Sequence, residues 1–306
     1  MGELERDHTI RKLESEIMNL REQLLWYKRT YEERSLAGII LDRIRNGKTR
    51  KTRARGPSTM IDPSKVDVNT ASGKRTIGTL CVIVNHNYYE NSIRLTQTAG
   101  QYFDWVLLDS GSGQVPPHAI RLPNIYYTGL LNNAVAIATA KGYRHLFFVC
   151  SDVLIDDTTA AGMAARLVEP QMENTGLYSP ASTGGSYGFC RKQPGSQLRD
   201  VPFVEGFAFV ADLGIMNRLC PVDTTKNLYG WGLDVAAGYL ARQAKMNIVI
   251  DDRISMDHTV GTGYSRETAE LEMLTWVNTL NDPGMSEFFK EQLAETSATD
   301  TGTTNE

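Results

Sequence analysis

The sequence has few cysteines and little net charge for its length. Four cysteines are scattered along 306 residues with no CxxC pair and no dense framework. Reduced thiols in a cytoplasmic setting are therefore the default expectation. The formal net charge is only −4, so the surface as a whole is not expected to bind nucleic acid, although a local basic patch is compatible with this value.

Long apolar runs are also absent. No run approaches the roughly 20 apolar residues that a membrane span requires, and the first ten residues, MGELERDHTI, lack the apolar region of a secretion signal. The composition, 41% hydrophobic and 22% charged, is ordinary for a globular chain that can bury a sizeable core. The sequence predicts a soluble cytoplasmic protein without stable membrane insertion.

The first forty residues carry a coiled-coil pattern. Apolar side chains recur at alternating steps of three and four, at Ile10, Leu13, Ile17, Leu20, Leu24, Tyr27 and Tyr31. Such an a/d seam favours a parallel two-stranded coiled coil. The alternative is a single amphipathic helix on the body of the protein, but the narrow seam favours a homodimer through residues 10–31, within an N-terminal helix over residues 1–45.

Two further segments are polar along their whole length. RIRNGKTRKTRARGPS, which begins at Arg43, places cations among Asn, Gly, Thr and Pro. This composition is typical of a disordered linker, here predicted over residues 46–76. The alternative is an arm that binds polyanions such as DNA. At the other end, residues 293–306 are predicted to be a disordered tail.

Between these segments, residues 77–292 alternate between strand-like and helix-like patterns. The strand-like runs TIGTLCVIV, FDWVLLDSGSG and HLFFVCSDV are each followed by polar residues, with helical stretches between them. This order predicts an α/β domain with a mostly parallel sheet and helices on both faces. Ligands of such sheets bind beyond the carboxyl ends of the strands. We therefore expect a site at Asn85, His86, Asn87, Asp109 and Asp152.

The succession of motifs resembles the GT-A glycosyltransferases. The chain contains, in order, LCVIVNHNYYENS, VLLDSGSG, NIYYTGLLNNAVAIATA, LFFVCSDVLID, VEGFAFV, YGWGLDVAAGYLAR and SMDH, within residues 77–262. Among these enzymes, the chain is most similar to the inverting family-two members of the rhamnosyltransferase kind. The resemblance implies a Rossmann-like GT-A domain that moves a sugar, with inversion, from a UDP- or dTDP-sugar to an acceptor hydroxyl.

The resemblance implies that the donor nucleotide binds at the strand ends. Residues implied to contact it are Asn85, His86, Asn87, Asp109, Asn132 and Ser151. In the family, the residue matched by Asp109 accepts a hydrogen bond from the base, and a carboxylate makes a strong, charge-assisted bond with the imide N–H of uracil or thymine. The competing interpretation of Asp109 is a turn-forming residue in DSGSG.

Cys150-Ser151-Asp152 matches the DxD-like element of the family, which implies a metal ligand at Asp152. His258 of SMDH could supply a second ligand, so that the cation would neutralise the donor diphosphate. Mn²⁺ tolerates imidazole better than Mg²⁺ does, so Mn²⁺ is the first expectation and Mg²⁺ the second. The alternative role of Asp152 is a helix N-cap, although Asp156 or Asp157 would cap that helix better.

GWGLD resembles the acceptor-side loop of metal-dependent galactosyltransferases. The general base that inversion requires would be Asp234, with N-capping of the next helix as its alternative role. Glu205, Gly206, Trp231 and Gly232 would line the acceptor side. The acceptor is either a glycan intermediate or modified bases in DNA, and the sequence does not separate the two.

Two positions depart from the family pattern. Cys150 stands where an acidic or amide residue is usual, and Leu233 stands where Glu often precedes the base. These departures leave a second hypothesis open, a coiled-coil scaffold whose GT-A domain has lost turnover. A nucleotidyltransferase fits less well, because NHNYYENS lacks the Gly-rich, basic loop that such enzymes usually carry after the first strand.

Overall fold

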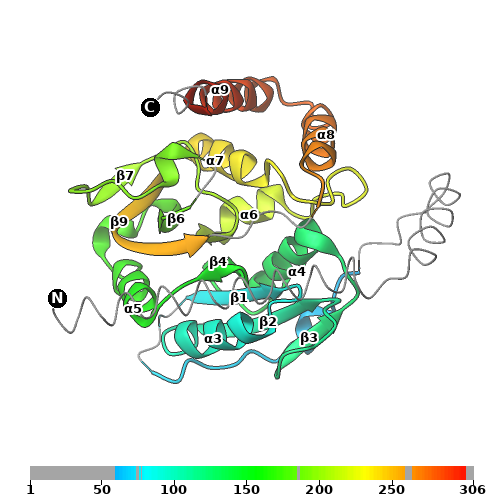
Figure 1. The fold of residues 1–306 in the computed structure, drawn as a ribbon, viewed down its shortest axis with the longest axis vertical. Coiled ribbons are helices and arrows are strands. Elements are labelled where there is room, and N and C mark those ends of the chain that lie inside the picture. The colour runs from blue at the N-terminus through cyan, green and yellow to red at the C-terminus, as the bar shows by residue number, and fades with distance from the viewer. Residues whose placement is uncertain (1–58, 74–75, 77, 185–186, 259–263, 301–306) are drawn as a thin grey trace, which may run out of the picture. The chain divides into compact units, whose positions relative to one another are not determined.

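The computed structural model describes residues 59–73, 76, 78–184, 187–258 and 264–300, with side chains as far as residue 292 (Figure 1). The predicted N-terminal helix over residues 1–45, its dimer contact at 10–31 and the basic stretch up to residue 58 lie outside them. None of the helices in the described part combines the length and apolar character that crossing a bilayer requires.

The described residues form a mixed nine-stranded sheet in the order β3-β2-β1-β4-β8-β6-β9-β5, with β7 pairing with β9. The strands are β1 (Thr79–Asn85), β2 (Asp104–Ser110), β3 (Ala119–Leu122), β4 (His145–Cys150), β5 (Val153–Leu154), β6 (Thr175–Ser182), β7 (Leu198–Asp200), β8 (Ala208–Asp212) and β9 (Asn247–His258). β1, β2, β3, β4, β6 and β9 run in one direction, and β5, β7 and β8 run against them. The predicted α/β class with a mostly parallel sheet is confirmed.

Helices cover both faces of this sheet (Figure 1). They are α3 (Tyr89–Ala99), α4 (Tyr126–Ala140), α5 (Asp157–Arg166), α6 (Leu213–Leu219), α7 (Leu233–Gln243), α8 (Arg266–Val277) and α9 (Pro283–Asp300), with short 3₁₀ turns η2 (Pro63–Lys65), η3 (Pro170–Met172) and η4 (Gly188–Cys190). α3 and α5 pack on one face, and α4, α6 and α7 pack on the other. α9 packs on α7.

The central strand β1 shows why apolar side chains are buried on both faces of the sheet. Leu80, Val82 and Val84 pack on the face covered by α4, α6 and α7, whereas Cys81 and Ile83 pack on the face covered by α3 and α5. All of these side chains are buried. A strand with helices on both faces is apolar at successive positions, because its odd and even side chains both enter a core.

The predicted linker over residues 46–76 needs a correction, because residues 59–73 pack on the domain. The side-chain oxygen of Asn133 in α4 accepts a hydrogen bond from the Ile61 N–H at 2.7 Å, and its amide donates to the Thr59 carbonyl at 3.0 Å. Val66 is buried, and Asn69 forms a β-bridge with Trp105. The segment is polar in sequence, yet its backbone bonds to the domain and Ile61, Val66 and Val68 pack against the core.

The predicted tail over residues 293–306 also needs a correction, because α9 continues to Asp300. Met285, Phe288 and Phe289, spaced at three and four residues, are buried against the core. That spacing places the three side chains on one face of a helix. Once the first turns of α9 are held in this way, each further residue adds a backbone hydrogen bond at a lower cost in entropy than nucleation.

Candidate active site

One edge of the sheet collects the predicted site residues. The carboxyl ends of β1, β2, β4 and β9 meet there, because these strands run in the same direction. β8 runs the opposite way, so the residues that precede it, 205–207, reach the same edge. Open α/β sheets bind their ligands at this edge.

Asn85 is the centre of a buried hydrogen-bond network at this edge. Its amide donates to Asp109 Oδ2 at 2.8 Å and to Ser112 Oγ at 3.1 Å. Its side-chain oxygen accepts from Ser151 Oγ at 2.8 Å and from the Tyr88 N–H at 3.0 Å. The ends of β1, β2 and β4 are therefore tied together by one side chain, and a satisfied buried network of this kind makes the edge rigid.

The structure shows the turn-forming role that the sequence left open for Asp109. Its Oδ1 accepts a hydrogen bond from the Ser112 N–H at 3.0 Å, which closes the turn after β2. The Asp109 side chain is fully buried, at 0% exposure. Contact between Asp109 and a nucleotide base stays a prediction.

His86 and Asn87 form the exposed rim of the network. His86 Nδ1 lies 2.7 Å from the Ser110 carbonyl oxygen, which can only accept, so we assign the proton to Nδ1. Asn87 Nδ2 lies 3.1 Å from His86 Nε2, and Asn87 Oδ1 accepts from the Gly113 N–H at 3.1 Å. Both side chains are held in place and accessible from the solvent side of the strand ends.

Asn132 does not belong to this cluster. Its amide donates to the Val222 carbonyl at 2.8 Å, and its side-chain oxygen accepts from the Val222 N–H at 2.8 Å. This buried side chain bonds to both the N–H and the carbonyl of Val222, as a neighbouring strand would, and so supports the backbone before the GWG loop. Its predicted contact with the donor receives no support from this position.

Asp152 and His258 are brought together by β5. This short strand pairs with the end of β9 so that Val153 lies opposite His258. As a result, Asp152 Oδ2 lies 3.5 Å from His258 Nε2. The other carboxylate oxygen of Asp152, Oδ1, is buried and has no hydrogen-bond partner among the described residues. The ring of Phe207 stacks on the His258 ring with centroids 4.1 Å apart.

The electrostatics of this pair suit a cation. Burial alone would lower the pKa of His258, but the hydrogen bond and the charge of Asp152, together with the charge of Glu205, outweigh burial and raise it. Within the described part of the chain, no group of three or more His, Cys, Asp or Glu side chains could hold a metal ion. Asp152 and His258 are only two of the ligands that a divalent cation needs, so a metal site at this pair stays a prediction, with substrate phosphates and water as the remaining ligands.

Asp234 lies in the first turn of α7 but is not its N-cap. The N-cap is Gly232, whose φ of 79° is left-handed. Asp234 accepts hydrogen bonds from the backbone of Val235, at 2.9 Å, and of Gly206. Burial raises the pKa of Asp234 to about 6, although these backbone hydrogen bonds lower it. The carboxyl group is thus poised to exchange a proton near neutral pH.

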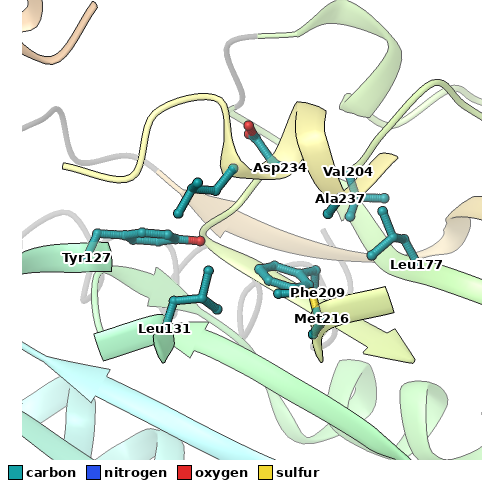
Figure 2. Close-up of a pocket in the computed structure, with 9 residues that line it drawn as sticks. Tyr127, Leu131, Leu177, Val204, Phe209, Met216, Asp234 and Ala237 are labelled. Atoms are coloured by element: carbon teal, nitrogen blue, oxygen red, sulfur yellow. The ribbon is translucent and has the colours of Figure 1, made fainter. Parts of the chain in front are cut away.

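A small apolar cavity lies directly below Asp234 (Figure 2). It is lined by Tyr127, Leu131, Leu177, Val204, Phe209, Met216, Leu233, Asp234 and Ala237. In Figure 2 the Asp234 carboxylate points away from these apolar side chains, whereas the Tyr127 hydroxyl points in among them. The pKa of Asp234 is raised by burial of its carboxyl group.

Trp231 belongs to an aromatic cluster on the predicted acceptor side. Its indole N–H donates to the Tyr264 hydroxyl at 2.9 Å, and the Arg266 guanidinium lies 5.9 Å from its ring centroid. Tyr264 in turn stacks on Tyr229, with centroids 4.4 Å apart. Gly230 has a φ of 78°, and a Cβ there would lie 2.1 Å from the Tyr127 ring. The loop therefore needs glycine at this position for both its conformation and its packing.

Glu205 and Gly206 lie between the two halves of the site. The charge of Glu205 raises the pKa of His258 on one side and of Tyr187 on the other, where burial is the larger cause. The charge of Asp234 also acts on Tyr187. The structure thus brings the predicted acceptor-side carboxylates and the Asp152–His258 pair to one place.

We compared the chain with known proteins. No family model matches it, and no curated protein matches it. Among solved structures, the chain is similar to GalNAc-T7, a GT-A glycosyltransferase whose structure was determined with UDP, GalNAc and Mn²⁺. The TM-score is 0.51 at 14% identity, and the alignment covers 73% of this chain and 51% of GalNAc-T7. The chain adopts the GT-A fold. The likeness concerns the fold alone, so the predicted family-two, rhamnosyltransferase-like subtype stays a prediction.

The two departures from the GT-A motif pattern have local explanations. Burial raises the pKa of the Cys150 thiol, and the charge of Asp152 raises it further, so the thiol stays protonated. A protonated thiol is a poor metal ligand. Leu233 is buried and lines the apolar cavity, where a Glu side chain would be costly. Neither change removes Asp152, His258 or Asp234 from the edge of the GT-A sheet.

Sequence reasoning missed the aromatic residues that hold the site together. Tyr127 contacts Gly206, Phe207 stacks on His258, and Tyr264 contacts Trp231. Gly206 lies more than 50 residues from Tyr127, His258 lies more than 50 from Phe207, and Trp231 lies more than 30 from Tyr264. No local pattern marks such pairs, because isolated aromatic residues are more often core residues.

We expect Asp234→Asn to stabilise the protein at pH 8. The folded protein binds a proton at Asp234 more tightly than the unfolded chain, so ionisation of Asp234 destabilises the wild type as pH rises from about 4 through 6. The difference between 3.8 and about 6 corresponds to at most roughly 3 kcal/mol, so a gain of about 1–3 kcal/mol is expected at pH 8. Urea unfolding at pH 4 and pH 8 measures it; an equal gain at both pH values would contradict the assignment.

Proposed function

We propose that the protein is a metal-dependent glycosyltransferase of the hexosyltransferase type. It moves a sugar, with inversion, from a UDP- or dTDP-sugar to an acceptor hydroxyl. The observation that carries this proposal is the arrangement at one sheet edge. The Asp152–His258 pair and Asp234, with a pKa of about 6, lie on either side of residues 205–207. In that pair, Asp152 Oδ1 is buried and lacks a hydrogen-bond partner among the residues that the structure describes.

The donor side consists of the strand-end network and the Asp152–His258 pair. Asn85 and Ser151 hold the strand ends in place, and His86 and Asn87 present polar atoms to the nucleotide. Asp152 and His258 would hold Mn²⁺, or Mg²⁺ as the second choice. Such a cation neutralises the charge that grows on the diphosphate leaving group.

Asp234 is the proposed general base. Inversion requires a group that takes the proton from the acceptor hydroxyl on the side opposite the leaving diphosphate. With a pKa of about 6, Asp234 is ionised at neutral pH and more basic than an ordinary aspartate. Glu205, Gly206, Trp231 and Gly232 would line the acceptor side, where the Trp231 ring offers a flat apolar face to a sugar.

Hydrolysis of a panel of sugar nucleotides tests this proposal. Purified protein is incubated with UDP-, dTDP- and GDP-sugars and Mn²⁺ without acceptor, and released nucleotide is measured. We expect slow hydrolysis of one UDP- or dTDP-sugar that depends on Mn²⁺ and is reduced at least about a hundredfold in Asp152→Ala, because that variant loses one of two protein ligands. Asp157→Ala, an exposed aspartate at the first residue of α5, is the matched control and should retain the activity.

The outcome that contradicts the proposal is equally definite. If no sugar nucleotide is hydrolysed and none raises the melting temperature, the chain does not bind a donor, and the scaffold hypothesis takes its place. If a donor is hydrolysed equally well by Asp152→Ala, the metal assignment is wrong. When an acceptor is found, the anomeric configuration of the product tests inversion directly.

The acceptor class, glycan or DNA, has its own test. Transfer to DNA should weaken steeply between low and moderate salt, since each phosphate contact releases counterions. It should also fall when residues 43–55, the basic stretch, are deleted. Transfer to a neutral glycan should respond to neither change. Full activity of the deletion variant would count against a DNA acceptor.

A further inference from the structure

Tyr127 is a partly buried aromatic residue that the proposed chemistry does not use. It lies in the first turn of α4, and its hydroxyl donates a hydrogen bond to the Gly206 carbonyl oxygen at 2.6 Å. Its ring packs edge-on against Phe148, with centroids 5.3 Å apart, and directly against Gly230. Burial raises the pKa of Tyr127 well above its ordinary value, so the hydroxyl remains a donor throughout the working pH range.

Gly206 stands between Tyr127 and Asp234. Its carbonyl accepts from the Tyr127 hydroxyl, and its backbone N–H donates to the Asp234 carboxylate. A Cβ built on Gly206 would lie 2.7 Å from the Tyr127 hydroxyl oxygen and 3.9 Å from Asp234 Cβ. The two side chains therefore bracket a single residue of backbone, with no room for a third side chain between them.

We propose that Tyr127 is a positioning residue that acts on Asp234 through the backbone of Gly206. The Tyr127 hydroxyl holds the Gly206 carbonyl, and this limits the movement of the Gly206 backbone, whose N–H acts on the carboxylate from the preceding peptide group. The ring itself is held by Phe148 and Gly230, so the constraint starts from a rigid part of the core. The value of this link for catalysis rests on the proposed function, but the link itself does not.

The link has a consequence for the proton on Asp234. A backbone N–H that donates to a carboxylate favours the ionised form and so lowers the pKa. Without the Tyr127 hydroxyl, the Gly206 N–H is held less firmly and donates less well, so the pKa of Asp234 rises. In the described part of the chain, Tyr187 and Cys190 also act electrostatically with Asp234; burial raises their pKa values, so they stay neutral. Glu205 precedes Gly206 in the chain, and the substitution at Tyr127 does not alter this carboxyl group.

Tyr127→Phe tests the proposal because it removes only the hydroxyl and keeps the ring. The Asp234 carboxyl is followed by ¹³C NMR of protein labelled at aspartate, with Asp234→Asn assigning the resonance. We expect the titration midpoint of Asp234 to rise by about 0.5–1 pH unit in Tyr127→Phe. During sugar transfer, the midpoint of the acidic limb of the pH–rate profile should move to higher pH by the same amount. The rate at pH 8 should change less than about threefold.

Two further variants separate positioning from general stability. Gly206→Ala pushes the Tyr127 hydroxyl away from the other side, so it should raise the midpoint in the same direction. Tyr178→Phe is the matched control: Tyr178 is fully buried, and its hydroxyl bonds to Asp251 at 3.4 Å. This control should lower stability without moving the titration of Asp234.

An unchanged Asp234 midpoint in Tyr127→Phe would overturn the proposal, as would an equal rise in Tyr178→Phe. The NMR titration decides this without any turnover. If the wild type transfers no sugar, the proposed function fails, yet the measured midpoints still show whether Tyr127 acts on Asp234. A rise in the midpoint with no change in the acidic limb would mean that Asp234 is positioned by Tyr127 but is not the base.

Discussion

Replacing Asp234 by Asn should lower the rate of sugar transfer about a thousandfold, because general-base catalysis contributes on that order and an amide cannot accept the proton. Asn has nearly the same shape and keeps an oxygen that can accept from the Val235 N–H, so the start of α7 should remain intact. The effect should appear in kcat, with the KM for the donor changed little, since the proposed donor side lies across residues 205–207 from Asp234.

The pH profile adds a second signature of Asp234. In the wild type, the rate should fall about tenfold per pH unit below about pH 6, because the protonated carboxyl cannot act as a base. The residual rate of Asp234→Asn should lack this limb. Asp223→Asn, an exposed carboxylate in the loop before α7, is the matched control and should retain the full rate. A loss in Asp234→Asn of less than tenfold would show that another group takes the proton.

Removal of Asp251 should cause the largest loss of stability that we predict. Its fully buried carboxylate accepts from Arg253 Nε at 2.8 Å and Nη2 at 2.9 Å, and Arg166 Nε lies 3.3 Å away. Asp251→Ala would leave two guanidinium groups facing each other in a half-buried place. Breaking buried pairs in this way costs about 3–5 kcal/mol, and we expect the lower end because both arginines are partly exposed.

The position of Asp251 connects this stability to the site. The residue lies at the bulge of β9, where the pairing with β6 shifts from Pro180↔Asp251 to Ala181↔Ser255. The bulge re-aims the last residues of β9, which carry His258, toward β5. We therefore expect Asp251→Ala also to weaken binding of Mn²⁺, a readout that isothermal titration gives directly.

Chemical and thermal unfolding measure the Asp251 prediction. A loss of about 3 kcal/mol should lower the melting temperature by roughly 10 °C for a domain of this size. Asp251→Asn, which keeps the shape and loses the charge, should lie between Asp251→Ala and the wild type. Asp200→Ala, an exposed aspartate on the neighbouring strand β7, should change stability by less than about 0.5 kcal/mol. Equal losses in Asp251→Ala and Asp200→Ala would refute the buried-pair argument.

The sequence by itself determined the α/β class and the sheet edge that collects the predicted site residues. Both are local properties: the apolar run of β1 reports burial on two faces, and polar residues such as Asn85 and Asp152 mark where strands end. Parallel strands then place those ends together, whatever the details of packing. Helix capping is local as well, and Asp156, expected to be the better cap, does accept from the Thr159 N–H.

Tertiary structure alone decided which of these side chains meet. Asp152 lies beside His258 because a two-residue strand, β5, pairs with the end of a bent β9 across more than 100 residues of sequence. Asn132, placed on the donor by resemblance, instead bonds to the backbone of Val222. Nothing local distinguishes these two outcomes, because each depends on a partner that only packing brings near.

The environment of Asp234 shows most clearly what only the tertiary structure decides. In the sequence it is an acidic residue near a helix start, where capping and catalysis are both reasonable roles. In the structure Gly232 takes the cap, an apolar cavity lies below the carboxylate, and Gly206 donates to it from another element. Desolvation and a fixed N–H are properties of surroundings, so the proton affinity of Asp234 arises only when the chain has folded.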